Sequence, residues 1–205
     1  MKAKATSPNA AKRPPRPRAA QTHEIRIIGG LWKRTKLKVA DKPGLRPTPD
    51  RVRETVFNWL GQDLSGLRCL DAFAGTGALG FEAASRGAQE VQLVEYDSAL
   101  ADQLKKTQAQ LQASAVHVVR GDGVSAIRQA APGSLDVIFI DPPFDAPLFE
   151  PALGACARAL APEGWVYLEA PSAYTDELLT AVGLTVHRHL KAGAVHAHLL
   201  KRSAA

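Results

Sequence analysis

Helices and strands are expected to alternate along the chain from Leu67 onward. Runs of aliphatic and β-branched residues predict the strands, and apolar residues at helical spacing predict the helices. The predicted strands are Arg68–Asp71, Glu90–Glu95, Val116–Arg120, Leu135–Asp141, Gly164–Glu169, Leu184–Leu190 and Ala194–Leu200. The predicted helices are Ala78–Arg86, Ser98–Leu111, Val124–Ala130, Leu148–Leu160 and Thr175–Val182. This alternation predicts an α/β, doubly wound fold in which helices cover both faces of a mostly parallel, seven-stranded sheet.

A glycine-rich turn, DAFAGTGALG at residues 71–80, joins the first predicted strand to the helix that follows it. Gly75, Gly77 and Gly80 have the spacing of a nucleotide-binding turn, where small residues let the backbone approach a ligand. The carboxylate of Asp71 would repel a pyrophosphate at the helix N-terminus, but it suits a ligand that carries an ammonium group. The turn therefore favours S-adenosylmethionine over NAD as the cofactor.

Two more acidic residues follow the next two predicted strands, at the same expected edge of the sheet. Glu95 lies 18 residues after Gly77, where its carboxylate can accept hydrogen bonds from both ribose hydroxyls of a nucleoside. Asp122 lies between Gly121 and Gly123 and can accept a hydrogen bond from an adenine amino group, while Gly123 allows the ring to approach. Because Asp-Gly pairs also form ordinary turns, the cofactor role of Asp122 depends on its place at the end of a strand.

The sequence Asp141-Pro142-Pro143-Phe144 directly follows the apolar run of the fourth predicted strand. Asp141 can accept a hydrogen bond from an amino group, and the two prolines stiffen the backbone and remove two donors. Phe144 offers a flat apolar face to a planar ring. Together these residues predict a rigid site that holds an exocyclic amine on an aromatic base.

Positive charge is concentrated at the N-terminal end of the chain. Residues 1–54 hold 15 Lys and Arg against 4 Asp and Glu, whereas residues 55–205 hold 11 against 16. A basic end on an acidic body predicts a polyanionic partner. Residues 1–22 lack apolar periodicity and are expected to form a disordered tail. The sequence predicts neither a membrane span nor a secretory signal, because no run of residues is long and apolar enough.

A small extension is predicted between the tail and the glycine-rich turn. Ile25–Ile28 and Lys36–Val39 predict two short strands of a hairpin. A turn and a helix are expected next, and either Asp50 or Thr48 is expected to cap that helix.

These motifs resemble those of doubly wound, Rossmann-like methyltransferases that use S-adenosylmethionine, and Asp141–Phe144 resembles the signature of the branch that methylates amines. The N-terminal sequence is more specific. IRIIGG at residues 25–30 and LRPTPDRVRETVFNWL at residues 45–60 resemble the N-terminal region of bacterial 16S ribosomal RNA guanine-N2 methyltransferases of the RsmD type. The resemblance extends over residues 24–202.

The resemblance implies an enzyme that transfers a methyl group from S-adenosylmethionine to N2 of a guanine in 16S ribosomal RNA, of the type that modifies guanine 966. The expected partner is 16S ribosomal RNA, within the small ribosomal subunit or an assembly intermediate. The expected location is the cytoplasm, without a membrane or a metal. Three regions are expected: the tail at 1–22, an RNA-binding extension at 23–66 and the methyltransferase domain at 67–205.

Each candidate residue has an expected role in this reaction. Asp141 and the backbone carbonyl of Pro142 would accept hydrogen bonds from the guanine amine, while Phe144 would stack on the base. The residues expected in catalysis are Asp141, Pro142, Pro143 and Phe144. Those expected to bind the cofactor are Asp71, Phe73, Gly75, Gly77, Glu95, Asp122 and Gly123. Those expected to bind RNA phosphates are Lys33, Arg34, Arg46, Arg51 and Arg53, although the segment 46–53 could instead brace the cofactor pocket.

Other functions share parts of this pattern. An amino-methyltransferase could act on DNA adenine, on another RNA or on a protein glutamine, but glutamine enzymes usually have Asn in place of Asp141 and DNA enzymes usually carry an added recognition domain. An NAD-dependent oxidoreductase would use the three glycines, but Asp71 and the Pro-Pro pair disfavour it. An RNA-binding protein without activity would not need the acidic residues at the strand ends.

Histidine and cysteine do not indicate a metal centre. His187, His189, His196 and His198 alternate with apolar residues in the last two predicted strands, and outward-facing positions explain them better than metal ligation. Cys69 and Cys156 are expected to be buried thiols of a reduced, cytosolic protein.

Overall fold

The computed structural model describes residues 24–38 and 48–203. Seven strands form one sheet in the order β5-β4-β3-β6-β7-β9-β8, and β1 pairs with β2 in a separate hairpin. The strands are β1 (Glu24–Arg26), β2 (Lys36–Lys38), β3 (Arg68–Asp71), β4 (Glu90–Glu95), β5 (Val116–Arg120), β6 (Leu135–Ile140), β7 (Leu160–Ala170), β8 (Leu184–Ala192) and β9 (Val195–Arg202). The helices are α1 (Asp50–Trp59), α2 (Ala78–Ser85), α3 (Ser98–Leu111), α4 (Gly123–Gln129), α5 (Phe149–Ala159) and α6 (Asp176–Thr180). The predicted α/β fold with a mostly parallel, seven-stranded sheet is confirmed.

The order of the strands determines where a ligand can bind. Strands β3 to β7 run parallel, whereas β9 lies antiparallel between β7 and β8. The chain enters the sheet at β3, moves outward through β4 to β5, and then returns to β6 on the other side of β3. The connections after β3 and β6 therefore leave in opposite directions, and ligands of doubly wound proteins bind at the carboxyl ends of such strands.

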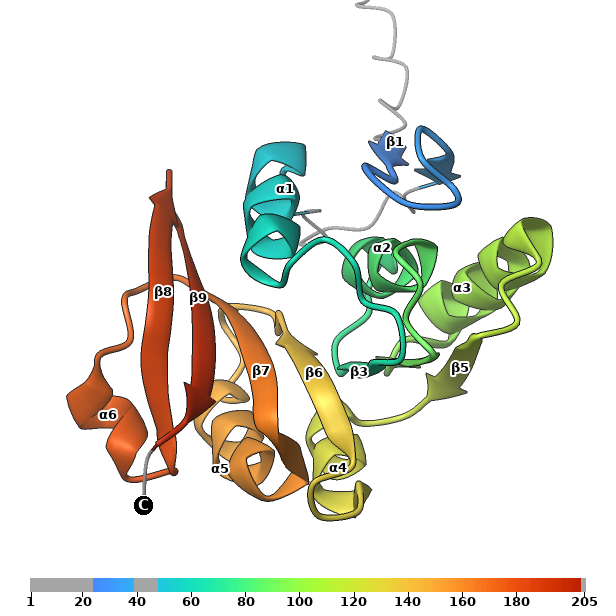
Figure 1. The fold of residues 1–205 in the computed structure, drawn as a ribbon. Helices are drawn as coiled ribbons and strands as arrows, with labels where there is room; N and C mark the ends of the chain where they lie inside the picture. The colour runs from blue at the N-terminus through green and yellow to red at the C-terminus, as the bar shows by residue number, and fades with distance from the viewer. Residues whose placement is uncertain (1–23, 39–47, 204–205) are drawn as a thin grey trace, which may run out of the picture.

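Helices cover both faces of the sheet (Figure 1). Apolar residues of α1, α2 and α3 pack with Val137 and Phe139 of β6 on one face. Residues of α4, α5 and α6 pack with Ile138 and Ile140 of the same strand on the other face. Alternate residues of β6 thus belong to different cores, as the two-residue period of a strand requires. This arrangement leaves the strand ends, rather than the sheet faces, available for a site.

The N-terminal hairpin packs against the same face as α1 and α2. Ile25 and Ile27 around β1, together with Leu37 of β2, are buried in one core with Val56 and Phe57 of α1. The extension therefore shares a hydrophobic core with the sheet across the predicted boundary between residues 66 and 67. The predicted tail at 1–22 and the start of the predicted turn lie outside the described residues.

The predicted cap of α1 is wrong. Pro49 occupies the cap position, and no side chain there makes a capping hydrogen bond. The hydroxyl of Thr48 donates to Asp141 instead, and the carboxylate of Asp50 pairs with Arg53. A tertiary partner thus engages Thr48, whereas Asp50 pairs with a residue of its own helix three positions later.

The prediction that all four histidines face outward is also wrong, because His198 is fully buried. Its Nε2 accepts a hydrogen bond of 3.0 Å from the backbone N–H of Tyr174. Burial lowers the pKa of His198 to about 4, so its ring is neutral at physiological pH. His187 and His189 are exposed, as expected. Among residues 24–38 and 48–203, no group of His, Cys, Asp and Glu is arranged to hold a metal.

Three smaller observations complete the description of the fold. Strand β7 begins at Leu160 rather than Gly164, because Leu160 pairs with Leu135 across a register shift in β6. Cys69 and Cys156 are both buried and unpaired with each other, which confirms the predicted buried thiols. In the described part of the chain, no helix is long and apolar enough to cross a membrane.

Candidate active site

Two carboxylates hold the glycine-rich turn between β3 and α2. Asp71 Oδ2 accepts a hydrogen bond of 3.0 Å from the backbone N–H of Gly80, and Glu95 Oε2 accepts one of 2.8 Å from that of Gly75. Gly75 and Gly77 have φ angles of 51° and 78°, in the left-handed region that favours glycine. The structure therefore brings the predicted residues of this turn together at the carboxyl ends of β3 and β4.

Asp71 lies beneath the turn, where its side chain is buried. Burial raises the pKa of Asp71 to about 7, the N–H of Gly80 opposes that rise, and the nearby charge of Glu95 adds to it. A side chain at Gly80 would approach Leu93 to 2.0 Å, so glycine is needed for α2 to pack this closely against the sheet. The structure shows Asp71 fastening α2 to β3, and its contact with a cofactor ammonium group stays a prediction.

Glu95 lies at the end of β4 with both carboxylate oxygens bonded to the backbone. Besides Gly75, it accepts a hydrogen bond of 2.8 Å from the N–H of Asp97. Each carboxylate oxygen has a second lone pair, so Glu95 can still accept from a ligand. The next residue, Tyr96, is 81% exposed. The sequence motifs did not indicate Tyr96, although an aromatic residue directly after the strand-end acid was a signal that could have found it.

Asp122 and Gly123 both have local structural partners. Asp122 caps α4 by accepting a hydrogen bond of 2.7 Å from the N–H of Ser125, and hydrogen bonding from the side chain and then the backbone of Ser125 lowers the pKa of Asp122. A side chain at Gly123 would approach the backbone oxygen of Ala72 to 2.0 Å. Gly123 is therefore required for α4 to start close to the turn after β3. The predicted contacts of both residues with an adenine ring stay predictions.

The Asp141–Phe144 loop leaves the sheet beside the glycine-rich turn, because β6 pairs with β3 and Asp71 lies opposite Phe139. Asp141 is half-buried. The ring of Phe144 is 40% exposed and lies 6.2 Å from that of Phe149, centroid to centroid. An acceptor and an aromatic face are thus both available at the same sheet edge as the turn.

A second carboxylate, that of Glu169, lies beside Asp141. The parallel register pairs Ile140 of β6 with Leu168 of β7, so the next residue of each strand lies side by side at the carboxyl ends. Glu169 is only 5% exposed. The sequence did not indicate Glu169, because an acid at the end of a predicted strand has many possible neighbours and only the register shows which one it has.

Two hydroxyl groups complete this acidic pair. Thr48 Oγ1 donates a long hydrogen bond of 3.4 Å to Asp141 Oδ2, and the Tyr167 hydroxyl donates one of 2.9 Å to Glu169 Oε2. Burial raises the pKa of both carboxyl groups, and the negative charge of Glu169 raises that of Asp141 further. The two carboxyl groups therefore titrate as a coupled pair, each with a pKa above its usual range.

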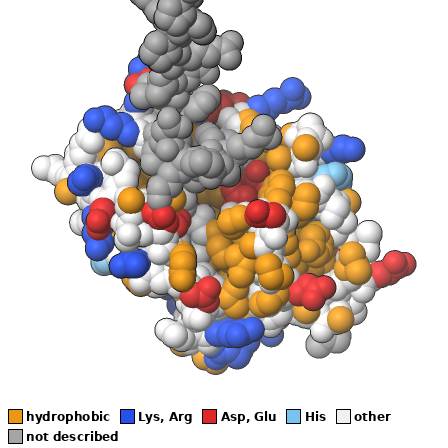
Figure 2. Space-filling view, turned by 180° about the vertical axis from the view of Figure 1, so that it is seen from behind, with side chains coloured by type: hydrophobic (Ala, Val, Ile, Leu, Met, Phe, Trp, Pro, Cys, Tyr) orange, Lys and Arg blue, Asp and Glu red, His pale blue; other side chains and the backbone are white. Residues whose placement is uncertain are grey.

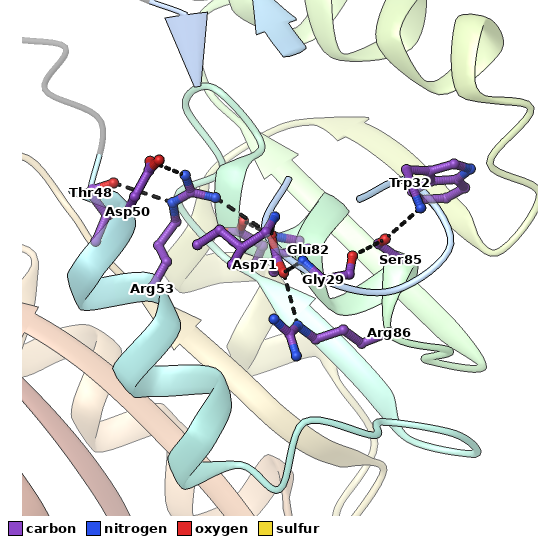
Figure 3. Close-up of polar contacts among 11 residues, drawn as sticks. Gly29, Trp32, Thr48, Asp50, Arg53, Asp71, Glu82, Ser85 and Arg86 are labelled. Atoms are coloured by element: carbon purple, nitrogen blue, oxygen red, sulfur yellow. Dashed lines mark hydrogen bonds and ion pairs between the residues drawn. The ribbon is translucent and has the colours of Figure 1, made fainter. Parts of the chain in front are cut away.

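Glu82 of α2 joins the N-terminal extension to the sheet domain (Figure 3). Its carboxylate accepts hydrogen bonds of 2.7 Å from the backbone N–H groups of Ile28 and Gly29. It also pairs with Arg86 Nε at 2.9 Å and with Arg53 Nη1 at 3.6 Å. This buried carboxylate therefore connects the hairpin, α1 and α2.

The structure corrects the role expected for Arg53. Its side chain is 0% exposed and also pairs with Asp50 at 2.6 Å, so it cannot reach an RNA phosphate in this conformation. The alternative, in which the segment 46–53 braces the cofactor pocket, stays a prediction. Lys33, Arg34 and Arg51 are exposed. Arg46 lies outside the described residues.

The exposed basic residues of the hairpin do not lie at the glycine-rich turn. Leu31 and Trp32, which precede Lys33, donate hydrogen bonds of 2.7 and 2.9 Å to Ser85 at the C-terminal end of α2. The glycine-rich turn lies at the opposite end of that helix. An RNA that contacts both the hairpin cations and the glycine-rich turn must therefore extend along the length of α2.

Comparison with known proteins identifies the family of this chain. Residues 25–201 match a family model described as Conserved hypothetical protein 95. Over 192 residues the chain is 42% identical to Ribosomal RNA small subunit methyltransferase D of Escherichia coli K12, covering 92% of this chain and 96% of the relative. The chain belongs to this methyltransferase family. A Haemophilus influenzae member with the same name is 43% identical over 71% of this chain and 78% of its own length.

Solved structures of similar proteins have the same fold. The Escherichia coli methyltransferase yhhF superimposes with a TM-score of 0.77 at 41% identity, covering 89% of this chain and all of that one. A Thermus thermophilus 16S rRNA N2 guanine methyltransferase, solved with AdoMet and guanosine, has a TM-score of 0.69 over 93% of this chain and 52% of its own. At 24% identity, this second likeness shows only the fold.

Proposed function

We propose that this protein transfers a methyl group from S-adenosylmethionine to N2 of a guanine in 16S ribosomal RNA. The observation that carries this proposal is the position of Asp141 and Phe144 beside the glycine-rich turn, in a member of the small-subunit rRNA methyltransferase family. The reaction requires three features at one edge of the sheet. These are a hydrogen-bond acceptor for the amine, an aromatic face for the base and a turn that binds a nucleoside. The expected partner is 16S ribosomal RNA, alone or in a small-subunit particle, in the cytoplasm.

The residues around the turn fit S-adenosylmethionine. Glu95 would accept hydrogen bonds from the ribose hydroxyls, and the exposed ring of Tyr96 would cover the adenine. Residues 71–80 contain no Lys or Arg, so the turn itself offers no cationic side chain to a pyrophosphate. When bound, this cofactor supplies a methyl group on a positively charged sulfur.

Asp141 is expected to position the amine rather than to deprotonate it first. The guanine N2 lone pair is delocalised into the ring, so two acceptors, Asp141 and the carbonyl of Pro142, would hold its N–H groups and point the lone pair at the methyl carbon. Alignment of bound reactants contributes about 7–11 kcal/mol to lowering a barrier. Methyl transfer from the bound cofactor would place positive charge on nitrogen, and the Asp141 carboxylate would stabilise that charge selectively. The methylated nitrogen would then lose one proton to solvent water.

Replacement of Asp141 tests this proposal. Asp141→Ala should lower methyl transfer to 16S ribosomal RNA by at least about 100-fold, because both alignment and charge stabilisation are lost. Binding of S-adenosylhomocysteine, measured by calorimetry, should stay within about three-fold. The substrate is RNA or small subunits from a strain that lacks the enzyme, and the product is identified as N2-methylguanosine by nucleoside mass spectrometry.

A neighbouring acid provides the control. Asp145 is exposed in the same loop, and Asp145→Ala should keep most of the activity. Near-normal turnover by Asp141→Ala would contradict the mechanism. A methylated adenine, or a methylated DNA, would show that the enzyme belongs to another branch of amino-methyltransferases.

A further inference from the structure

We infer that Glu169 recognises the target guanine by accepting a hydrogen bond from its N1–H, beside Asp141, which accepts from the N2 amine. This inference rests on the proposed function and assigns the group that distinguishes guanine from adenine. Asp141 alone cannot make this distinction, since a carboxylate accepts equally well from the amine of either base.

The first support is the position of the two carboxyl groups. Ile140 pairs with Leu168 in the parallel ladder, which places Asp141 and Glu169 at the same level on adjacent strands. Alternation along each strand points both side chains to the same face of the sheet, the face that holds Phe139 and Tyr167. Two neighbouring acceptors are therefore presented together at the edge where the target base is expected.

The second support is that the pair lacks cationic partners. Among the described residues, neither Asp141 nor Glu169 forms an ion pair with Lys or Arg. Thr48 has a single hydroxyl proton but lies within hydrogen-bonding reach of both carboxyl groups. A buried carboxylate such as that of Glu169, and a half-buried one such as that of Asp141, are costly to the folded protein with so few donors unless a ligand supplies more.

The third support is the pattern of donors on guanine. N1–H and the N2 amine are adjacent donors on one edge of the base, so they match two adjacent carboxylates. Adenine carries an acceptor at N1 and no amine at C2, so it would place an acceptor against Glu169. A site built to receive a donor rejects an analogue that lacks it, because a buried polar group is left unpaired.

Tyr167 gives Glu169 a defined orientation. Its hydroxyl donates to Oε2 at 2.9 Å, so the other oxygen of the carboxylate does not need this donor and can accept from the base. Glu169→Gln can keep this bond, since the amide oxygen also accepts from Tyr167. The amide NH₂ would then take the place of the second oxygen and present a donor where the wild-type protein presents an acceptor.

The test exchanges the hydrogen-bonding partner on the base. 16S ribosomal RNA is prepared with 2-aminopurine at the guanine that the wild-type protein methylates; this base keeps the C2 amine but has an acceptor at N1. Wild-type protein should methylate guanine at least about 10-fold faster than 2-aminopurine, as measured by kcat/KM. Glu169→Gln should lower that ratio by about 10-fold or more, because its amide donates to the N1 acceptor.

Control variants show whether the base preference belongs to Glu169 itself. Glu163→Gln alters an exposed acid of the same strand and should leave the base preference unchanged. Thermal melting and S-adenosylhomocysteine binding report whether Glu169→Gln is folded, and Glu169→Asp provides a second variant with an acceptor. An unchanged guanine to 2-aminopurine ratio in folded Glu169→Gln would overturn the inference. Failure of wild-type protein to methylate guanine would instead overturn the proposed function.

Discussion

At the scale of single residues, the buried carboxyl group of Asp71 dominates the electrostatics of the glycine-rich turn. The backbone N–H of Gly80 is its hydrogen-bond donor, and the pKa near 7 results mainly from burial. An acid whose pKa is higher in the folded state than in the unfolded state binds more protons when folded. Its stabilising contribution is therefore complete below about pH 4 and is lost as pH rises through about 7.

Asp71→Asn should remove this pH dependence. The amide oxygen can still accept from Gly80, but no proton is bound or released. Relative to the variant, the wild-type free energy of unfolding should fall between pH 4 and pH 7, by at most about 4 kcal/mol for a pKa change from 3.8 to about 7. Urea denaturation at several pH values measures the difference. If the free energy of unfolding varies with pH in parallel for the two proteins, Asp71 does not titrate in this range. His198 is present in both proteins, so its contribution cancels in the comparison.

At the scale of elements, Glu82 connects the hairpin, α1 and α2 through its single carboxylate. Glu82→Ala would leave Arg53 buried without this partner and would free the N–H groups of Ile28 and Gly29. We expect a loss of about 3–5 kcal/mol in the free energy of unfolding, the usual effect of removing one partner of a buried ion pair. Urea denaturation measures the loss, and faster amide exchange at Ile28 and Gly29 would locate it.

Glu54, exposed on α1, offers a matched control for Glu82. Glu54→Ala should change the free energy of unfolding by less than about 0.5 kcal/mol, as is usual for surface substitutions. A similarly small effect of Glu82→Ala would show that hydrophobic packing alone holds the extension in place.

At the scale of the whole molecule, charge is distributed unevenly. Figure 2 shows a face whose centre is hydrophobic, with Asp and Glu side chains bordering it and Lys and Arg around the rim. The basic N-terminal quarter of the sequence favours contact with an RNA backbone.

Salt should therefore weaken RNA binding steeply, because each phosphate contact releases counterions. Lys33→Ala combined with Arg51→Ala should lower the slope of log affinity against log salt by about 2, one for each phosphate contact. Filter binding with 16S ribosomal RNA at several salt concentrations measures the slope. The matched control is Lys105→Ala with Lys106→Ala, which removes two exposed cations from α3. Equal slopes for the two double variants would exclude Lys33 and Arg51 from the RNA contact.

The sequence predicted those features of the fold and of the site that depend on a local pattern of residues. Alternating strands and helices predicted the sheet, since periodicity states which residues face the core. The positions of Asp71, Glu95 and Asp141 at one edge followed from the parallel direction of the strands. Family resemblance in the N-terminal segment then indicated the class of substrate.

The tertiary structure decided which side chains meet. Glu163 and Glu169 are chemically identical acids of one strand, yet only the register of β7 with β6 places Glu169 beside Asp141. Arg53 belongs to a basic segment typical of a nucleic-acid surface, but packing of α1 on α2 buries it against Glu82. Local propensity and periodicity in the sequence determine which residues of a helix or strand face the core and where that element ends. The partner of a buried charge depends on contacts between residues far apart in the chain, and only the packed fold determines them.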